Sequence, residues 1–146
     1  MATNIKTRYK PSIATKIKRP LFLSRVPAGT FSPADDYLEK ALDFNEHLIK
    51  HEAATFFCRI SGESMKGAGI FSGDLAIVDR SLKAVSGSIV VVTLNGETNC
   101  KRLKLVKNKT YLCPENPAFK TIEIAQDADF EIWGVVTNVI HKVGKS

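Results

Sequence analysis

The chain has 146 residues, of which 44% are hydrophobic and 25% are charged, and its formal net charge at pH 7 is +6. This length suits one domain with its own core, and the composition excludes collagen-like, wholly disordered and membrane-spanning proteins. No stretch approaches the ~20 apolar residues of a membrane helix, and no apolar run follows the basic N-terminus as in a secretory signal, so we expect a cytoplasmic protein.

The excess positive charge lies in residues 1–28. This segment holds seven basic residues and no acidic one, which leaves 14 basic against 15 acidic residues in the rest of the chain. Its prolines and its lack of helical periodicity predict a flexible N-terminal arm. A solvated tail and a nucleic-acid arm are both open, but no helix-turn-helix pattern supports sequence-specific DNA binding.

One or two short helices are predicted next. Ser32 and Pro33 form a helix start, and Asp35 follows three residues after the serine. Apolar residues continue at helical spacing through residue 42, and Asp43 is a candidate cap for a second helical segment that ends near His51.

The period then changes to that of strands. Aromatic and β-branched runs, separated by short glycine-containing turns, predict seven strands. They cover residues 55–60, 75–78, 88–94, 98–106, 110–112, 121–124 and 130–140. Asn95-Gly96 is a strong hairpin signal between two of them. The fold class is therefore mostly β, an antiparallel domain with short helices at its front.

Two residues stand out chemically. Lys101 shares one face of its strand with Leu103 and Leu105, and a lysine held among aliphatic groups has a lowered pKa and becomes a competent general base. Ser64 lies in a turn that follows Gly62, where successive backbone amides are able to face one anion. A snorkelling surface lysine and an ordinary turn serine are the alternatives for each residue taken alone.

Together the two residues suggest a Ser–Lys dyad, a known variant of the serine triad. The histidines offer no better base, because the segment between His47 and His51 lacks the glutamate of a zinc-protease helix. Cys58, Cys100 and Cys113 have neither disulfide nor zinc spacing, so reduced, inert thiols are expected. We expect no cofactor and no metal.

Several motifs in order carry a family resemblance. Ser61-Gly62-Glu63-Ser64-Met65, residues 73–79 (GDLAIVD), 87–90 (GSIV), Cys100-Lys101-Arg102-Leu103 and residues 131–136 (EIWGVV) closely resemble the peptidase domain of the LexA/UmuD family of self-cleaving peptidases. The resemblance runs from about Ala28 to His141 and is closest to the UmuD branch, because only 28 residues precede the Ala28–Gly29 bond of the matching cleavage segment Val26-Pro27-Ala28-Gly29.

The resemblance implies a fold, a site and partners. It implies a peptidase S24 domain over residues 29–146 with a signal-peptidase-like β fold, and an arm, residues 1–28, that is removed by self-cleavage at Ala28–Gly29. It makes Ser64 the nucleophile and Lys101 the general base, with the backbone amides of Glu63 and Ser64 as the oxyanion hole. One departure is Asn99, where the family often has threonine.

The implied partners belong to the response to DNA damage. The RecA–single-stranded-DNA filament is the implied co-protease, and a homodimer of the shortened chain is implied to join a UmuC-type subunit of an error-prone translesion polymerase. A signal-peptidase relative, a repressor-like protein and a non-catalytic interaction protein on the same scaffold are the competing interpretations.

Overall fold

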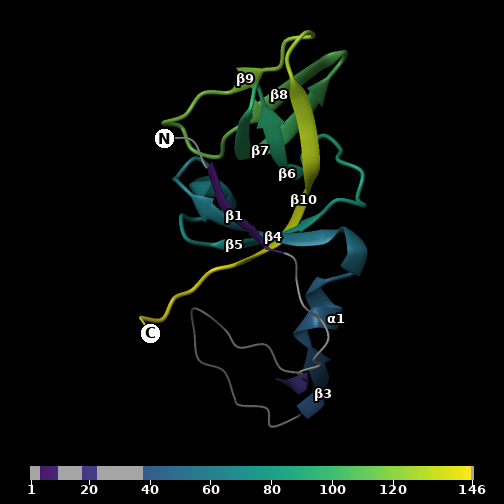
Figure 1. Ribbon diagram of the computed structural model, residues 1–146. Helices are drawn as coiled ribbons and strands as arrows, with labels where there is room; N and C mark the ends of the chain where they lie inside the picture. Colours follow the sequence, from purple (N-terminus) through teal and green to yellow (C-terminus); the bar gives the residue numbers. More distant parts are fainter. Residues whose placement is uncertain (1–3, 10–17, 23–37, 146) are drawn as a thin grey trace. The chain divides into compact units, whose positions relative to one another are not determined.

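The computed structural model describes the backbone of residues 4–9, 18–22 and 38–145, with side chains from Asp43 onward (Figure 1). The chain divides into two compact units, one of Met1–Pro11 with His51–Ser146 and one of Ser12–Lys50, which are described separately below. All the residues implicated by the sequence in chemistry, apart from the cleavage segment, belong to the first unit.

The larger unit is built on one sheet. Its eight strands in the described residues are antiparallel to their neighbours and follow the order β1-β4-β5-β10-β6-β7-β8-β9, with a further pairing of β1 to β7. The strands are β1 (Asn4–Tyr9), β4 (Thr55–Ser61), β5 (Leu75–Asp79), β6 (Ile89–Leu94), β7 (Glu97–Val106), β8 (Lys109–Cys113), β9 (Ile122–Glu123) and β10 (Phe130–Ile140). Short 3-10 helices, Glu52–Ala54 and Lys66–Ala68, precede and follow β4.

The seven predicted strands and the mostly β fold class are confirmed. The predicted Asn95-Gly96 hairpin joins β6 to β7, with Leu94 paired to Glu97. Both turn residues have positive φ, 51° for Asn95 and 84° for Gly96, which is the requirement of the tight hairpin turn that matches the twist of the flanking strands. β1 is a strand that the sequence did not predict.

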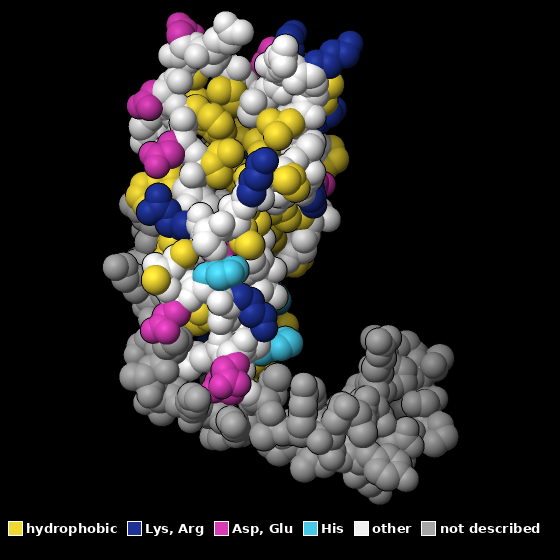
Figure 2. Space-filling model, turned by 90° about the vertical axis from the view of Figure 1, so that its right-hand side faces the viewer, with side chains coloured by type: hydrophobic (Ala, Val, Ile, Leu, Met, Phe, Trp, Pro, Cys, Tyr) yellow, Lys and Arg dark blue, Asp and Glu magenta, His cyan; other side chains and the backbone are white. Residues whose placement is uncertain are grey.

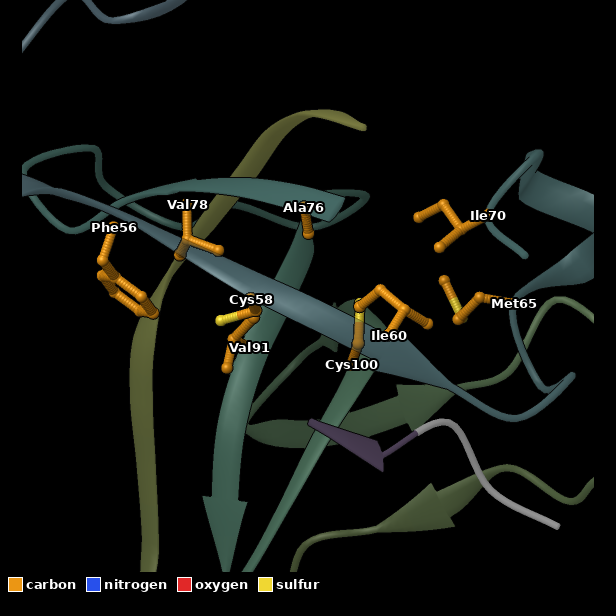
Figure 3. Close-up of a cluster of buried hydrophobic side chains, with 9 residues drawn as sticks. All are labelled: Phe56, Cys58, Ile60, Met65, Ile70, Ala76, Val78, Val91 and Cys100. Atoms are coloured by element: carbon orange, nitrogen blue, oxygen red, sulfur yellow. The ribbon is translucent and has the colours of Figure 1, made fainter. Parts of the chain in front are cut away.

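Two clusters of buried side chains form the core of this unit. The first, drawn in Figure 3, joins β4 and β5 to the turn after β4 and to the central strands. Its members are Phe56, Cys58, Ile60, Met65, Ile70, Ala76, Val78, Val91 and Cys100. The second cluster lies on the β6–β7–β8 part of the sheet and consists of Val90, Val92, Leu103 and Leu112. Because Val90 and Val91 belong to different clusters, β6 is buried on both faces, as its uninterrupted apolar run predicts.

Trp133 of β10 is the chain's single tryptophan and packs beside the first cluster. Its ring meets the Phe56 ring edge-on, with 6.3 Å between centroids. The Arg80 guanidinium lies 5.1 Å from the centre of the Trp133 ring, and Arg80 Nε donates to the Trp133 carbonyl at 3.0 Å. Arg80 thus contacts both the ring and the backbone of Trp133, and so joins the end of β5 to β10.

Histidine–aspartate pairs lie at both ends of β5. His51 Nδ1 is 2.6 Å from Asp79 Oδ2 at the end of the strand, and His141 Nδ1 is 2.5 Å from Asp74 Oδ1 just before it. Burial raises the pKa of the Asp79 carboxyl, but hydrogen bonds from Ser81 and His51 outweigh burial, so the net effect is a lowered pKa. These histidines therefore have structural partners in the sheet.

The smaller unit holds β2 (Lys18–Phe22), β3 (Leu38–Asp43) and α1 (Phe44–Leu48). α1 begins where predicted, because Asp43 caps it by accepting from the Asn45 amide at 3.0 Å. The helix predicted before it is wrong over Leu38–Asp43, which instead form a strand paired with β2. The helical spacing of the apolar residues there was overridden by a cross-strand partner, and the predicted helix start at Ser32 lies outside the described residues.

Among the helices of the described residues, none has the length and apolar character needed to cross a lipid bilayer. One face of the molecule, drawn in Figure 2, carries acidic and basic side chains interspersed with hydrophobic ones. This mixture agrees with the near balance of charge that the sequence gives outside residues 1–28.

Candidate active site

Ser64 lies in the turn between β4 and the following 3-10 helix. Gly62 opens this turn with φ of 100°, a left-handed conformation that favours glycine. The chain reverses within a few residues, and Met65 and Ile70 then return to the core. Ser64 itself is completely buried. A fully buried serine in a sharp turn is unusual, because turn serines are ordinarily exposed to solvent.

The turn is held by a segment distant in sequence. Ser64 O accepts from the Glu115 amide at 2.7 Å, and the Gly67 amide donates to Glu115 O at 2.7 Å. A Cβ at Gly67 would lie 2.5 Å from Glu115 O, so this close backbone approach requires glycine. The neighbouring Asn116 Nδ2 donates to Glu63 O at 2.9 Å. Residues 115 and 116 together fix the carbonyls of Glu63 and Ser64.

Lys101 lies on β7, where it is paired with Val90 of β6 and is only 3% exposed. It shares its strand face with buried Leu103, as the alternation of side chains predicts. Leu105, the third member of the predicted apolar face, is 45% exposed. The buried part of this strand face therefore includes Lys101 and Leu103 but not Leu105.

The structure brings the two predicted residues together. Lys101 Nζ donates to Ser64 Oγ at 2.7 Å, and both side chains are buried. If the amine loses its proton, the same contact reverses, and the serine hydroxyl donates to nitrogen. This is the geometry that a general base needs in order to take a proton from a hydroxyl.

The electrostatics favour that reversal. Burial lowers the pKa of the Lys101 amine, because water no longer stabilises its positive charge. A negative charge on the adjacent Cys100 would act in the opposite direction. Burial raises the pKa of the Cys100 thiol to about 12, so the thiol is neutral at physiological pH and leaves the effect of burial on Lys101 uncompensated.

A side-chain contact links the Lys101 strand to the segment that holds the serine turn. Arg102 Nε donates to Glu115 Oε1, while Arg102 Nη1 donates to the carbonyl of Gly87 at 2.6 Å. Arg102 adjoins Lys101, and Glu115 binds the backbone on both sides of the turn. Glu115, Asn116 and Gly67 were not predicted from the sequence, because their roles depend on long-range contacts that no local pattern indicates.

Asn99 lies two residues before Lys101, on the same side of β7. Its Oδ1 atom is buried and has no hydrogen-bond partner among the described residues. The backbone of Asn99 is paired with Asn4 of β1. An unpartnered buried acceptor is costly unless something donates to it during function, and Asn99 is therefore a notable polar position on the same face of β7 as Lys101.

Some of the other predicted site residues lie in the part of the chain that the structure describes, and some do not. Ala28 and Gly29 lie outside the described residues. Glu63 and Ser64, whose amides are the predicted oxyanion hole, lie in the turn held by residues 115 and 116. No disulfide joins the three cysteines, which all lie in the described part of the chain; Cys58 and Cys100 are buried and Cys113 is partly buried.

Comparison with known proteins shows the family of the chain. The Peptidase S24-like family matches residues 20–137. SamA of Salmonella typhimurium is 48% identical over 123 residues, which cover 84% of this chain and 85% of SamA. ImpA of Escherichia coli is 46% identical over 134 residues, 90% of each chain. The LexA repressor of Ectopseudomonas mendocina is 35% identical over 135 residues, 92% of this chain and 66% of the repressor. The chain therefore belongs to the Peptidase S24-like family, as one of its UmuD-like members.

Proposed function

We propose that this chain is a self-cleaving serine peptidase of SOS mutagenesis, with Ser64 as nucleophile and Lys101 as general base, and that it cuts its own Ala28–Gly29 bond. The observation that carries the proposal is the contact of 2.7 Å between Lys101 Nζ and Ser64 Oγ in a buried site. A lysine amine in such a place acts first as a base, when it takes the serine proton, and then as an acid, when it gives a proton to the leaving group.

The first half of the reaction forms an ester. Neutral Lys101 takes the hydroxyl proton of Ser64, Oγ bonds to the Ala28 carbonyl carbon, and the negative charge moves to the carbonyl oxygen. Amides of the turn, with Glu63 and Ser64 as candidates, stabilise that charge. The carbon–nitrogen bond then breaks, and the Lys101 ammonium gives its proton to the departing Gly29 amine.

The second half regenerates the site. Lys101 takes a proton from water, the hydroxide adds to the ester carbon, and the Ser64 oxygen leaves and recovers its proton from Lys101. The products are residues 1–28, with a carboxylate at Ala28, and residues 29–146, with a new amine at Gly29. The cut removes seven basic residues and no acidic one, so it converts a basic chain into one near neutrality.

Docking of the cleavage segment is a step at which the rate of self-cleavage can be regulated. A segment lying over the dyad excludes water and lowers the pKa of Lys101 further, so the reactive state forms only when the segment is docked. We propose that a RecA–single-stranded-DNA filament stabilises this docked state. The shortened chain would then form a homodimer and join a UmuC-type polymerase subunit for translesion synthesis.

Intact-mass analysis of the purified chain tests the proposal. Without RecA, incubation between neutral and alkaline pH should yield residues 1–28 and 29–146, at a rate that rises with pH as Lys101 loses its proton. Activated RecA filament should accelerate the same cut at neutral pH. A rate that is flat or falling with pH would contradict the role of Lys101 as the base.

Matched variants separate the dyad from its surroundings. Ser64→Ala and Lys101→Ala should remain folded and uncut, whereas Ser61→Ala and Lys104→Ala, a nearby serine and a lysine on the opposite strand face, should cleave like the parent chain. Continued scission at Ala28–Gly29 in purified Ser64→Ala would exclude this serine as nucleophile.

A further inference from the structure

Two strand edges near the dyad in the larger unit are not covered by β5, β6 or β8. β4 pairs with β5 on one side, and its other side is the edge to which β1 is paired. On β7, β8 pairs only with Arg102–Val106, while β6 pairs along the other side of Glu97–Arg102. The first half of β7 therefore has an edge that β8 does not cover. We call the space between this edge and β4 the strand slot.

β1 occupies the strand slot. It is antiparallel to β4, with Asn4 opposite Ser61, Ile5 opposite Ile60, Arg8 opposite Cys58 and Tyr9 opposite Phe57. Asn4 is also paired with Asn99 of β7, so the beginning of β1 touches both edges. Figure 3 shows this strand in purple alongside β4, near the labelled Ile60 and Cys100.

The strand slot ends at the dyad. β4 stops at Ser61, three residues before Ser64, and Lys101 follows Asn99 by two residues on β7. The end of the strand slot is therefore within a few residues, along the chain, of both the serine and the lysine. The buried Oδ1 atom of Asn99, which has no partner among the described residues, is an acceptor at the same place.

The ladder between β1 and β4 is short and irregular. The register of β1 with β4 shifts between Ile5 and Arg8, which interrupts an already short ladder. Covalent tethering gives β1 a high effective concentration at the slot, and any other segment of the same chain has the same kind of advantage over a separate peptide.

We propose that the strand slot is a binding site for an extended peptide, that residues 4–9 fill it in the intact chain, and that the cleavage segment displaces them to reach Ser64. β1 is then a competing strand that restrains self-cleavage. This inference rests on the proposed function for its kinetic consequence but not for the occupancy of the slot. The inference gives residues 4–9 a role in restraining self-cleavage, which their positive charge does not explain.

Proline variants of the full chain test the pairing directly. Ile5→Pro with Arg8→Pro removes two backbone N–H groups and disfavours the strand, whereas Ile5→Ala with Arg8→Ala changes the same side chains but keeps the backbone donors. In a Ser64→Ala background, the amides of Thr55–Ser61 that face β1 should exchange with deuterium faster in the proline variant than in the alanine variant. Equal exchange in the two would overturn the occupancy of the slot by β1.

The same pairs of substitutions in the chain with Ser64 intact test the competition. Self-cleavage without RecA, followed by intact mass, should be roughly tenfold faster in the proline variant than in the alanine variant, equivalent to ~1.4 kcal/mol. Faster exchange with an unchanged or slower cut would overturn the competition. Faster exchange with no cut in any chain, the parent included, would refute the proposed peptidase and leave the occupancy of the slot standing.

Discussion

The strand that carries Lys101 and the turn that carries Ser64 are positioned by different means. β7 is a regular strand, paired with β6 along its first half, and alternation alone directs Lys101 inward beside Leu103. The Ser64 turn has no regular ladder. It is held by Glu115 and Asn116, more than 50 residues further along the chain. One half of the site is thus encoded locally, and the other half forms only when the whole unit folds.

Replacing Lys101 tests the locally encoded half and has the largest expected effect. Lys101→Met keeps a long apolar side chain and removes the base, so self-cleavage should fall by at least ~10³-fold. The same change should raise the free energy of unfolding at neutral pH by about 1–2 kcal/mol, because a desolvated amine is removed. Activity and stability should therefore move in opposite directions.

The difference in unfolding free energy between the parent chain and Lys101→Met should change with pH in a definite direction. The folded state lowers the pKa of Lys101, so the folded chain loses this proton at a lower pH than the unfolded chain. Stability of the parent chain relative to Lys101→Met should therefore rise as pH increases toward ~10.4, the ordinary pKa of lysine. Urea titrations of both chains over this range measure it, and a constant difference would exclude a lowered pKa.

Substitution of Gly67 tests the half that depends on tertiary contacts. Gly67→Ala places a methyl group 2.5 Å from the Glu115 carbonyl oxygen, so the turn must move away from residue 115. We expect a loss of about 1–3 kcal/mol of stability and a reduced cleavage rate. Gly144→Ala is the control, because a Cβ there meets nothing within 4 Å. A parent-like Gly67→Ala would show that the close approach to Glu115 does not position Ser64.

The smallest effect is expected at Asn116. Asn116→Asp removes the donor to Glu63 O and retains an oxygen able to accept from the Ala118 amide, so only the bond to the turn is lost. Stability should fall by about 1 kcal/mol, with a severalfold slower cut, measured by denaturant titration and by intact mass. Asn138→Asp, an exposed position on β10, controls for the added charge. Equal self-cleavage rates in the two variants would show that Asn116 does not help to position Ser64.

This contrast also explains what the sequence could predict. The seven strands, the Asn95-Gly96 hairpin and the inward direction of Lys101 follow from local periodicity and turn chemistry. The contact of Lys101 with Ser64 does not follow from local pattern, because it depends on where the fold places a strand and a distant turn. Glu115 and Asn116 were missed because their role is to bind backbone atoms elsewhere, which leaves no periodic signal.

The wrong helix over Leu38–Asp43 and the unpredicted strands β1 and β2 have a related cause. Leu38–Asp43 has apolar residues at helical spacing, yet it is a strand because β2 supplies a partner. β1 and β2 carry charged and proline residues that indicate an arm when read alone. Each becomes a strand by pairing with an edge elsewhere in the chain, and the availability of that edge cannot be read from a local window.

The environment of Trp133 gives the protein a built-in optical reporter. As the single indole of the chain, it is wedged between the Phe56 ring and the Arg80 cation at the junction of β4, β5 and β10. Its emission therefore senses the integrity of the central sheet. Fluorescence can follow unfolding in every variant discussed above without an added dye or label.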